Sequence, residues 1–290
     1  MIVMIVSLAA SIVNFENILD TQKIKFDVYS FILSMFAFGG ITLGVGNLTD
    51  GGLLSLSAVL PLAIGIITGI LFVFRQCHLE KPFLDVKIMK NKNYTLAVIS
   101  SMLLYLVMMG GSVLMPLYVQ SVLGKSAITS ALVTFPGSIA TALVNPFAGR
   151  IYDKMGIKKL AVAGSIFLLI SNVGMCFVTS SMPLFISAVL NVIRNVSIGC
   201  LMMPLLTWGT SQVDTLKTSD ASSLLTSLRT VSGSIGAAVF VGIMSMVTAS
   251  SVALGENASM HGLNIAFLSM SVGTLILVLI AVIGIHEKTK

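Results

Sequence analysis

Long apolar runs separated by short polar segments occupy most of the chain. Each run is about 20 residues long, the length that an α-helix needs to cross a hydrocarbon layer about 30 Å thick. The runs lack the alternation of barrel strands, and in lipid only helices or closed barrels satisfy their backbone hydrogen bonds. The pattern therefore predicts transmembrane helices at residues 28–47, 53–74, 94–119, 127–148, 159–179, 183–209, 222–249 and 263–285.

Residues 1–13 are also apolar, but they are too few to cross a bilayer. They lack the basic leader and the small-residue cleavage site of a signal peptide. They also show no clear polar face, which a helix lying in the membrane interface would have. We expect residues 1–27 to be the remnant of a preceding span and an inner loop, with an upstream part of the protein before them. The alternative is an intact protein whose first residues lie in the interface.

Composition agrees with a membrane protein. The 290 residues are 56% apolar and 10% charged, whereas a soluble domain has roughly a quarter charged residues. The net charge of +6 does not indicate a nucleic-acid partner, because the basic residues do not form one patch with interleaved aromatics. They lie between the apolar runs instead.

The basic residues also predict the orientation of the helices, because lysine and arginine are retained on the cytoplasmic side. Nearly all of them lie in alternate polar segments or close to them, on one side: Lys23, Lys25, Arg75, Lys81, Lys87, Lys90, Lys92, Arg150, Lys154, Lys158, Lys159, Lys217, Arg229, Lys288 and Lys290. The opposite segments, 48–52, 120–126, 180–182 and 250–262, contain only Lys125. We therefore expect a multi-pass protein of the cell membrane with a cytoplasmic C-terminus.

Small residues at four-residue spacing recur within the runs and allow helices to approach closely. Examples are Gly40 with Gly44, Gly65 with Gly69, and Ser232 with Gly236. We interpret them as packing faces of a helix bundle.

No pattern indicates an enzyme. The three cysteines, Cys77, Cys176 and Cys200, show no CxxC spacing, and the adjacency of Cys77 to His78 does not make a metal site. No embedded nucleophile, histidine cluster or acid pair is visible. We expect neither a metal nor a cofactor.

The strongest local signal is the short, charge-rich segment 149–159, predicted to be a cytoplasmic loop. Its glycines permit a tight reversal, and Asp153 is suited to cap a helix or to pair with a neighbouring base. The alternative is that any short inner loop carries a few positive charges. The candidate residues are Gly149, Arg150, Asp153, Lys154, Gly156, Lys158 and Lys159.

This segment, G-x-x-x-D-K-x-G-x-K-K, resembles the inner-loop signature of the major facilitator superfamily of secondary transporters. The resemblance implies that Asp153, Arg150 and Lys154 form charge and helix-dipole contacts that lock one access state. Segments 75–85, 116–127 and 221–236 look like the fourteen-span drug:proton antiporter branch of that family.

The resemblance implies an all-α integral membrane protein with part of the major facilitator fold. Residues 28–93 would be two extra spans and a basic cytoplasmic loop, and residues 94–290 a six-helix C-terminal bundle. The implied function is proton-coupled export of hydrophobic or cationic drugs by alternating access, together with an N-terminal helical bundle missing from this chain. The alternatives are export of a lipid, siderophore or metabolite, and a non-transporting membrane partner or truncated product.

Two arginines fall inside predicted spans, where a charge costs about 2.5–3.5 kcal/mol even on a lenient insertion scale. Arg194 lies beside Asn191 and Asn195, and Arg229 lies about two turns into its span. They are candidate cavity or gating residues, and the alternative is that each merely ties helices together. Further candidates for lining a cavity are Tyr118, Gln120 and Asn145.

The acidic residues, in contrast, all fall in predicted loops or at span ends. Proton coupling commonly relies on an intramembrane carboxylate. In the resembled family such residues lie in the first bundle, so we expect the proton carrier outside this chain.

Overall fold

The computed structural model describes residues 27–285 apart from 52–54, 80–84, 252–254 and 256. Within this part of the chain every regular element is a helix, which confirms the predicted all-α class. The predicted remnant at residues 1–27 lies outside the described residues except for Asp27.

Seven helices are long and apolar enough to cross a membrane in the described part of the chain. In chain order they are α2 (Val28–Gly51), α3 (Leu56–His78), α4 (Lys92–Leu117), α5 (Ala127–Cys176), α6 (Leu184–Thr210), α7 (Thr218–Ser250) and α8 (Ala258–Leu279). Short 3-10 turns at Val86–Lys90 and Thr215–Lys217 precede α4 and α7, and π-helical turns at Tyr118–Val122 and Ile280–Gly284 follow α4 and α8.

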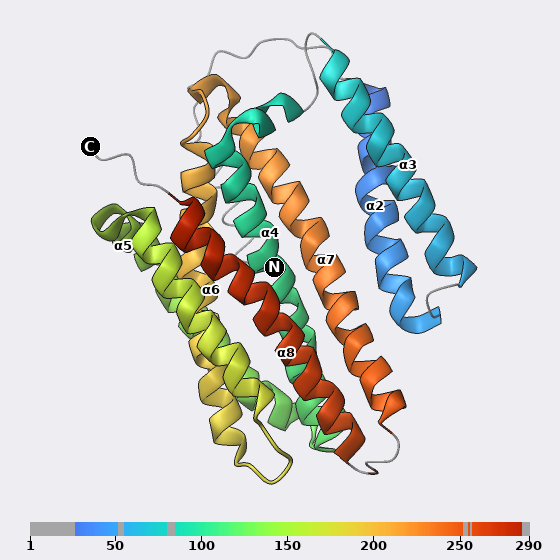
Figure 1. The fold of residues 1–290 in the computed structure, drawn as a ribbon, viewed down its shortest axis with the longest axis vertical. Helices are drawn as coiled ribbons and strands as arrows, with labels where there is room; N and C mark the ends of the chain where they lie inside the picture. Colours follow the sequence, from blue (N-terminus) through green and yellow to red (C-terminus); the bar gives the residue numbers. More distant parts are fainter. Residues whose placement is uncertain (1–26, 52–54, 80–84, 252–254, 256, 286–290) are drawn as a thin grey trace, which may run out of the picture.

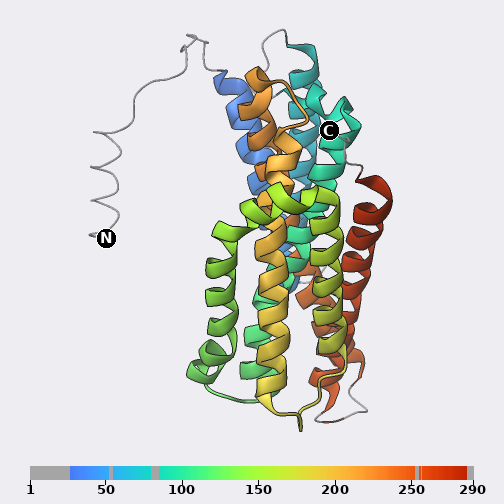
Figure 2. The same ribbon diagram turned by 90° about the vertical axis from the view of Figure 1, so that its left-hand side faces the viewer.

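Helix α5 consists of two spans that meet at Gly156, where the backbone leaves the helical region with φ 75° and ψ 166°. Figure 2 shows the two halves on either side of α6. With this division, each predicted span corresponds to a helix. The predicted loop at 149–159 is wrong, however, because the chain stays helical up to the bend. Glycine has no Cβ and tolerates positive φ, so one residue is enough to reverse the chain.

Other predicted loops are also shorter than expected, because the helices continue past the apolar runs. Gly51 still belongs to α2, His78 to α3, and Ala258 already to α8. A helix needs only its backbone hydrogen bonds to extend into the polar interface, so hydropathy marks the membrane boundary and not the end of the helix.

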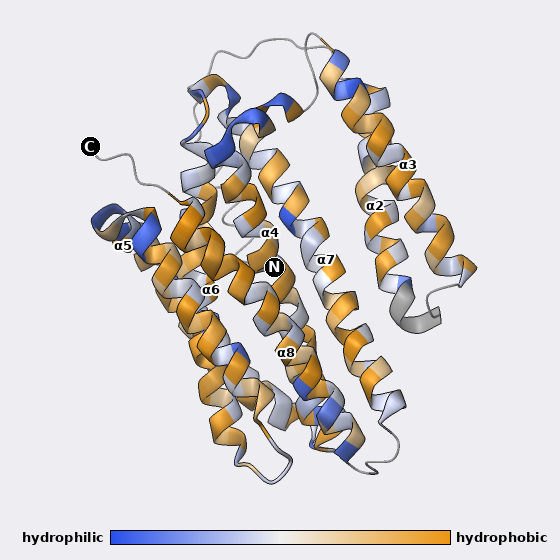
Figure 3. Ribbon diagram, viewed as in Figure 1, coloured by the Kyte–Doolittle hydropathy of each residue, from blue (hydrophilic) through white to orange (hydrophobic). Residues whose placement is uncertain are grey.

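The helices form two groups (Figure 1). The spans of α4 to α8 pack into one bundle, while α2 and α3 form an antiparallel hairpin that contacts the bundle through α2 against α7. Consecutive spans run in opposite directions, so the connections collect at two ends. The hydrophilic residues are concentrated at these ends and the helix bodies are apolar, as Figure 3 shows.

The bundle has an apolar interior and an apolar exterior. Tyr94, Leu114 and Phe267 are fully buried between helices, while Ile128 and Phe185 are about three-quarters exposed, at 74% and 75%. A soluble protein would cover such an exterior with polar side chains, whereas lipid accepts apolar ones.

Small residues lie where helices approach most closely. Gly40 of α2 meets Gly65 and Pro61 of α3, and a Cβ on Gly40 would lie 2.7 Å from the Pro61 carbonyl oxygen. At the crossing of α7 and α4, a Cβ on Gly236 would lie 2.2 Å from the Leu106 carbonyl oxygen. One turn earlier, Ser232 donates a hydrogen bond of 2.9 Å to the Met102 carbonyl. The spacing of small residues therefore predicted true contact faces.

We expect Gly236→Ala to destabilise the bundle, because backbone atoms cannot move aside for the added methyl group. Overpacking of this kind costs about 1–3 kcal/mol. The measurement is the thermal unfolding midpoint of the purified chain in detergent. Gly242→Ala on the same helix is the matched control, since nothing lies within 4 Å of its added Cβ. Equal midpoints for the two variants would contradict the close crossing.

Candidate functional site

A polar seam joins the first half of α5 to α6. Thr141 donates a hydrogen bond of 3.1 Å to the Asn195 carbonyl, and the Asn195 amide donates to the Asn191 carbonyl at 2.8 Å and to its side-chain oxygen at 3.1 Å. Gly137 makes room, because a Cβ there would lie 2.6 Å from the Asn195 amide nitrogen. The two asparagines are therefore packed against α5 and held by hydrogen bonds within the membrane.

Arg194 lies between these asparagines in sequence but faces a different helix. Its guanidinium occupies a notch on α4, where a Cβ on Gly111 would lie 1.2 Å from Nη1. The side chain is only 4% exposed. Its Nε and Nη1 atoms find no hydrogen-bond partner among the described residues. A buried donor without a partner costs about 1–3 kcal/mol, and more when the group is charged.

Arg229 of α7 is the second buried cation, at 8% exposed. Its guanidinium carbon lies 4.9 Å from the ring centre of Tyr105 on α4. An aromatic face attracts a cation through its quadrupole, which is worth about 2 kcal/mol when both groups are desolvated. Arg229 therefore has a partner that ties α7 to α4, although its Nε makes no hydrogen bond with the described residues.

The three candidates for lining a cavity lie in different surroundings. Tyr118 is fully buried, and its hydroxyl accepts a hydrogen bond of 3.2 Å from Ser187. Gln120, two residues later, is exposed. Asn145 is half-buried beside Gly199 of α6, and its side-chain oxygen has no partner in the described part of the chain. Only Asn145 continues the polar seam.

The charged segment at the bend of α5 is largely exposed. Arg150 lies 5.9 Å from the Phe147 ring centre. Asp153 and Lys154 are exposed in the last turns before the bend. Asp153 forms neither an ion pair nor a cap with any described residue, so its carboxylate is open to contacts outside this bundle. Gly149 is also open, with nothing within 4 Å of an added Cβ. Beyond Gly156, Lys158 is half-buried and Lys159 exposed.

Sequence reasoning missed some members of the site. The four-residue spacing of Gly137, Thr141 and Asn145 places them on one helix face, and this spacing was available as a signal. The role of Gly111 could not be predicted in this way, because nothing in the sequence around it indicates that Arg194, 83 positions later, packs against it.

Comparison with known proteins identifies the relatives of this chain. Residues 74–237 match the family model of the Major Facilitator Superfamily. The chain is 28% identical to the MFS-type transporter YcnB of Bacillus subtilis over 273 residues, which are 94% of this chain and 58% of that protein. It is 31% identical to the lincomycin resistance protein LmrB of Listeria innocua over 230 residues, 79% of this chain and 49% of that protein.

A third relative is named for the transport of riboflavin. The riboflavin transporter RibZ of Clostridioides difficile is 27% identical over 226 residues, 78% of this chain and 48% of that protein. The chain thus spans about half the length of the curated relatives it matches.

The notch at Gly111 generates a prediction with a double-mutant cycle. Gly111→Ala displaces the Arg194 guanidinium, so we expect a loss of about 1–3 kcal/mol in the free energy of unfolding. Arg194→Met removes an unpaired buried charge and is expected to be neutral or stabilising. In the double variant the flexible Met side chain yields to the new methyl group, so the Gly111→Ala loss should shrink.

The measurement is chemical unfolding of the purified chain in detergent. Gly39→Ala is the control, because nothing lies within 4 Å of its added Cβ, and its effect should add to that of Arg194→Met. Additive behaviour of Gly111→Ala and Arg194→Met would show that the two residues are not in contact.

Proposed function

Because the chain belongs to the major facilitator superfamily, we propose that it is the C-terminal part of a proton-coupled exporter of amphiphilic or cationic compounds. The observation that carries this proposal is the 31% identity to a lincomycin resistance protein over most of the chain. The chain is a multi-pass membrane protein of a transporter family. The direction of transport, its coupling to protons and the class of substrate are what we propose.

We assign the hairpin α2–α3 to two extra spans and residues 94–285 to the second six-helix bundle. The separation of the hairpin from the other spans supports this division (Figure 1). A first bundle would supply the remainder, since the relatives are about twice as long as the stretch matched. A substrate site at mid-membrane between two bundles is the general arrangement in secondary transporters.

Arg194 is the residue of this bundle that we propose to couple proton movement to access. Its two buried, unpaired nitrogens favour a carboxylate in the deprotonated form. The described carboxylates of this chain lie at helix ends, so the partner would come from the first bundle. A carboxylate that pairs with Arg194 in one access state would be able to take up a proton when the pair separates.

The bend of α5 is proposed to stabilise one access state. Asp153 and Lys154 are exposed, and the bend of α5 lies at the same end of the molecule as the end of α3 and the start of α4 (Figure 1). Charges in this position are available for contacts with the facing bundle, and separation of the bundles would break these contacts. Gly156 fixes the reversal that places both residues there.

A second candidate function is export of a polar metabolite, favoured by the similarity to a riboflavin transporter. Both candidates use the same fold and the same seam. They differ in the compound that the complete transporter moves.

We expect efflux only when this chain is paired with a first bundle. The assay follows lincomycin and ethidium accumulation in cells lacking their own exporters, with riboflavin export measured in parallel. Cells with the complete transporter should accumulate less drug, and Arg194→Met should abolish the difference while leaving the protein in the membrane. Riboflavin export without drug efflux would select the second candidate, and robust efflux by residues 1–290 alone would refute the two-bundle proposal.

The proposed orientation is tested separately by cysteine labelling. Lys154→Cys should be protected from a membrane-impermeant maleimide in intact cells and should react after permeabilisation. Lys125→Cys, at the opposite end, should react in intact cells. Both are made in a background where Cys77, Cys176 and Cys200 are replaced by serine or alanine. Labelling of position 154 from outside would reverse the orientation.

A further inference from the structure

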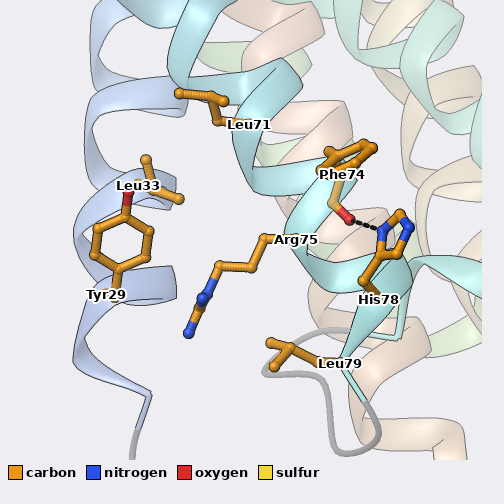
Figure 4. A pocket seen from close by; sticks show the side chains of 7 residues that line it. All are labelled: Tyr29, Leu33, Leu71, Phe74, Arg75, His78 and Leu79. Atoms are coloured by element: carbon orange, nitrogen blue, oxygen red, sulfur yellow. Dashed lines mark hydrogen bonds between the residues drawn. The ribbon is translucent and has the colours of Figure 1, made fainter.

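The hairpin α2–α3 contains a pocket of about 340 Å³ near the end where α3 finishes. Figure 4 shows Arg75 extending from α3 toward Tyr29 on α2, with His78 and Phe74 on the other side. The residues that line it are Tyr29, Leu33, Leu71, Phe74, Arg75, His78 and Leu79. None of them belongs to the site proposed for transport.

Arg75 is held in place by three groups. Its Nη2 atom donates to both carboxylate oxygens of Asp27 at 3.2 Å, and its Nε donates to the Ser30 hydroxyl at 3.1 Å. The guanidinium carbon lies 4.9 Å from the Tyr29 ring centre. Hydrogen bonds from Ser30, together with Arg75, hold the pKa of Asp27 below its ordinary value. The guanidinium plane is therefore fixed before any ligand arrives.

One nitrogen of the Arg75 guanidinium remains available to a ligand. Nη1 makes no hydrogen bond with any described residue, and the side chain is 37% exposed. The Asp27 carboxylate, in contrast, accepts four hydrogen bonds, two from Ser30 and two from Arg75. Four is about the capacity of a carboxylate, so Asp27 serves as the anchor and Nη1 as the open donor.

His78 contributes a second polar group at the same rim. Its Nδ1 lies 2.8 Å from the Phe74 carbonyl oxygen. A carbonyl only accepts, so Nδ1 carries the hydrogen, and Nε2 remains without a hydrogen bond in the described part of the chain. The ring also packs on Phe74, with centroids 4.4 Å apart.

The rest of the lining is apolar. Leu33, Leu71, Phe74 and Leu79 supply the walls, and the cationic group lies at one rim, in the last turn of α3. A fixed cation at the headgroup level above an apolar wall matches an amphiphile with an anionic head. A free inorganic anion would make no contact with the apolar wall, and a hydrocarbon would make no hydrogen bond with the guanidinium.

We propose that this pocket binds a phospholipid of the cytoplasmic leaflet, with its phosphate on Arg75 Nη1 and an acyl chain along Leu33 and Leu71. A planar guanidinium binds phosphate oxygens well, and the volume falls within the range of small-molecule sites. The negative charge of Asp27 opposes the phosphate, so its removal increases affinity. The bound lipid joins α2 to α3 where the hairpin has only one ion pair among its described residues.

The test is native mass spectrometry of the full 290-residue chain in detergent, titrated with phosphatidylglycerol. We expect one lipid to be retained at low lipid concentration. Arg75→Met should weaken retention about tenfold, the effect of losing one charge-assisted hydrogen bond. Lys125→Met, at the opposite end, is the control and should bind as the wild type does.

Two further variants separate lipid binding from the stability of the hairpin. Asp27→Asn breaks the ion pair but leaves Arg75, so it should bind lipid at least as tightly as the wild type while lowering the thermal midpoint. Leu71→Trp fills the apolar wall but leaves Arg75 and its ion pair with Asp27 in the chain, so it should lose lipid while keeping the midpoint. Retention unchanged in Arg75→Met, or lost equally in Asp27→Asn and Arg75→Met, would overturn the proposal.

Two competing ligands identify the chemistry. Diacylglycerol, which lacks the phosphate, should not be retained, and millimolar inorganic phosphate should not displace phosphatidylglycerol. Retention of diacylglycerol would reduce the pocket to a hydrocarbon groove, and displacement by phosphate would make it a soluble-anion site. Each of these results contradicts the lipid assignment but leaves the proposed transport function standing.

Discussion

Backbone N–H and C=O groups inside a hydrocarbon layer find partners only within the protein, and this requirement governs the whole structure. It makes each apolar run a helix, and it leaves the helices to associate through close contact instead of exclusion from water. Glycine is therefore important for packing, because it lets the backbones of two helices approach closely. Gly236 lets α7 touch the α4 backbone at Leu106, and Gly40 and Gly65 let the hairpin close.

The same requirement applies to buried side-chain donors, which also find partners only within the protein. Asn195 donates to Asn191 and accepts from Thr141 in the seam, and Arg229 lies over the face of Tyr105. Arg194 differs, because Gly111 gives it space while its Nε and Nη1 atoms find no acceptor among the described residues. An unpaired cation in a low-dielectric surrounding responds strongly to any carboxylate that approaches. For this reason Arg194 is the residue of the bundle that we propose to respond to a carboxylate from the first bundle.

Charges that form ion pairs lie elsewhere. The two ion pairs among the described residues, Arg75 with Asp27 and Lys217 with Asp85, both join segments at the ends of helices. There water and headgroups reduce the cost of a charge, so ion pairs can fix connections without a large desolvation penalty. The lipid pocket belongs to this same layer, which explains how one hairpin end combines a fixed cation with an apolar wall.

The sequence alone determined the spans, the all-helical class and the family resemblance, because hydropathy summed over about 20 residues is a local property. It also singled out Arg194 and Arg229 as costly residues in lipid. Tertiary structure decided where those residues point: Arg194 into a notch at Gly111, and Tyr118 into a fully buried contact with Ser187. It also replaced the expected loop by a bend at Gly156 and brought Asp27 to Arg75. Such pairings join residues far apart in the chain, and no local pattern specifies which faces of two helices will meet.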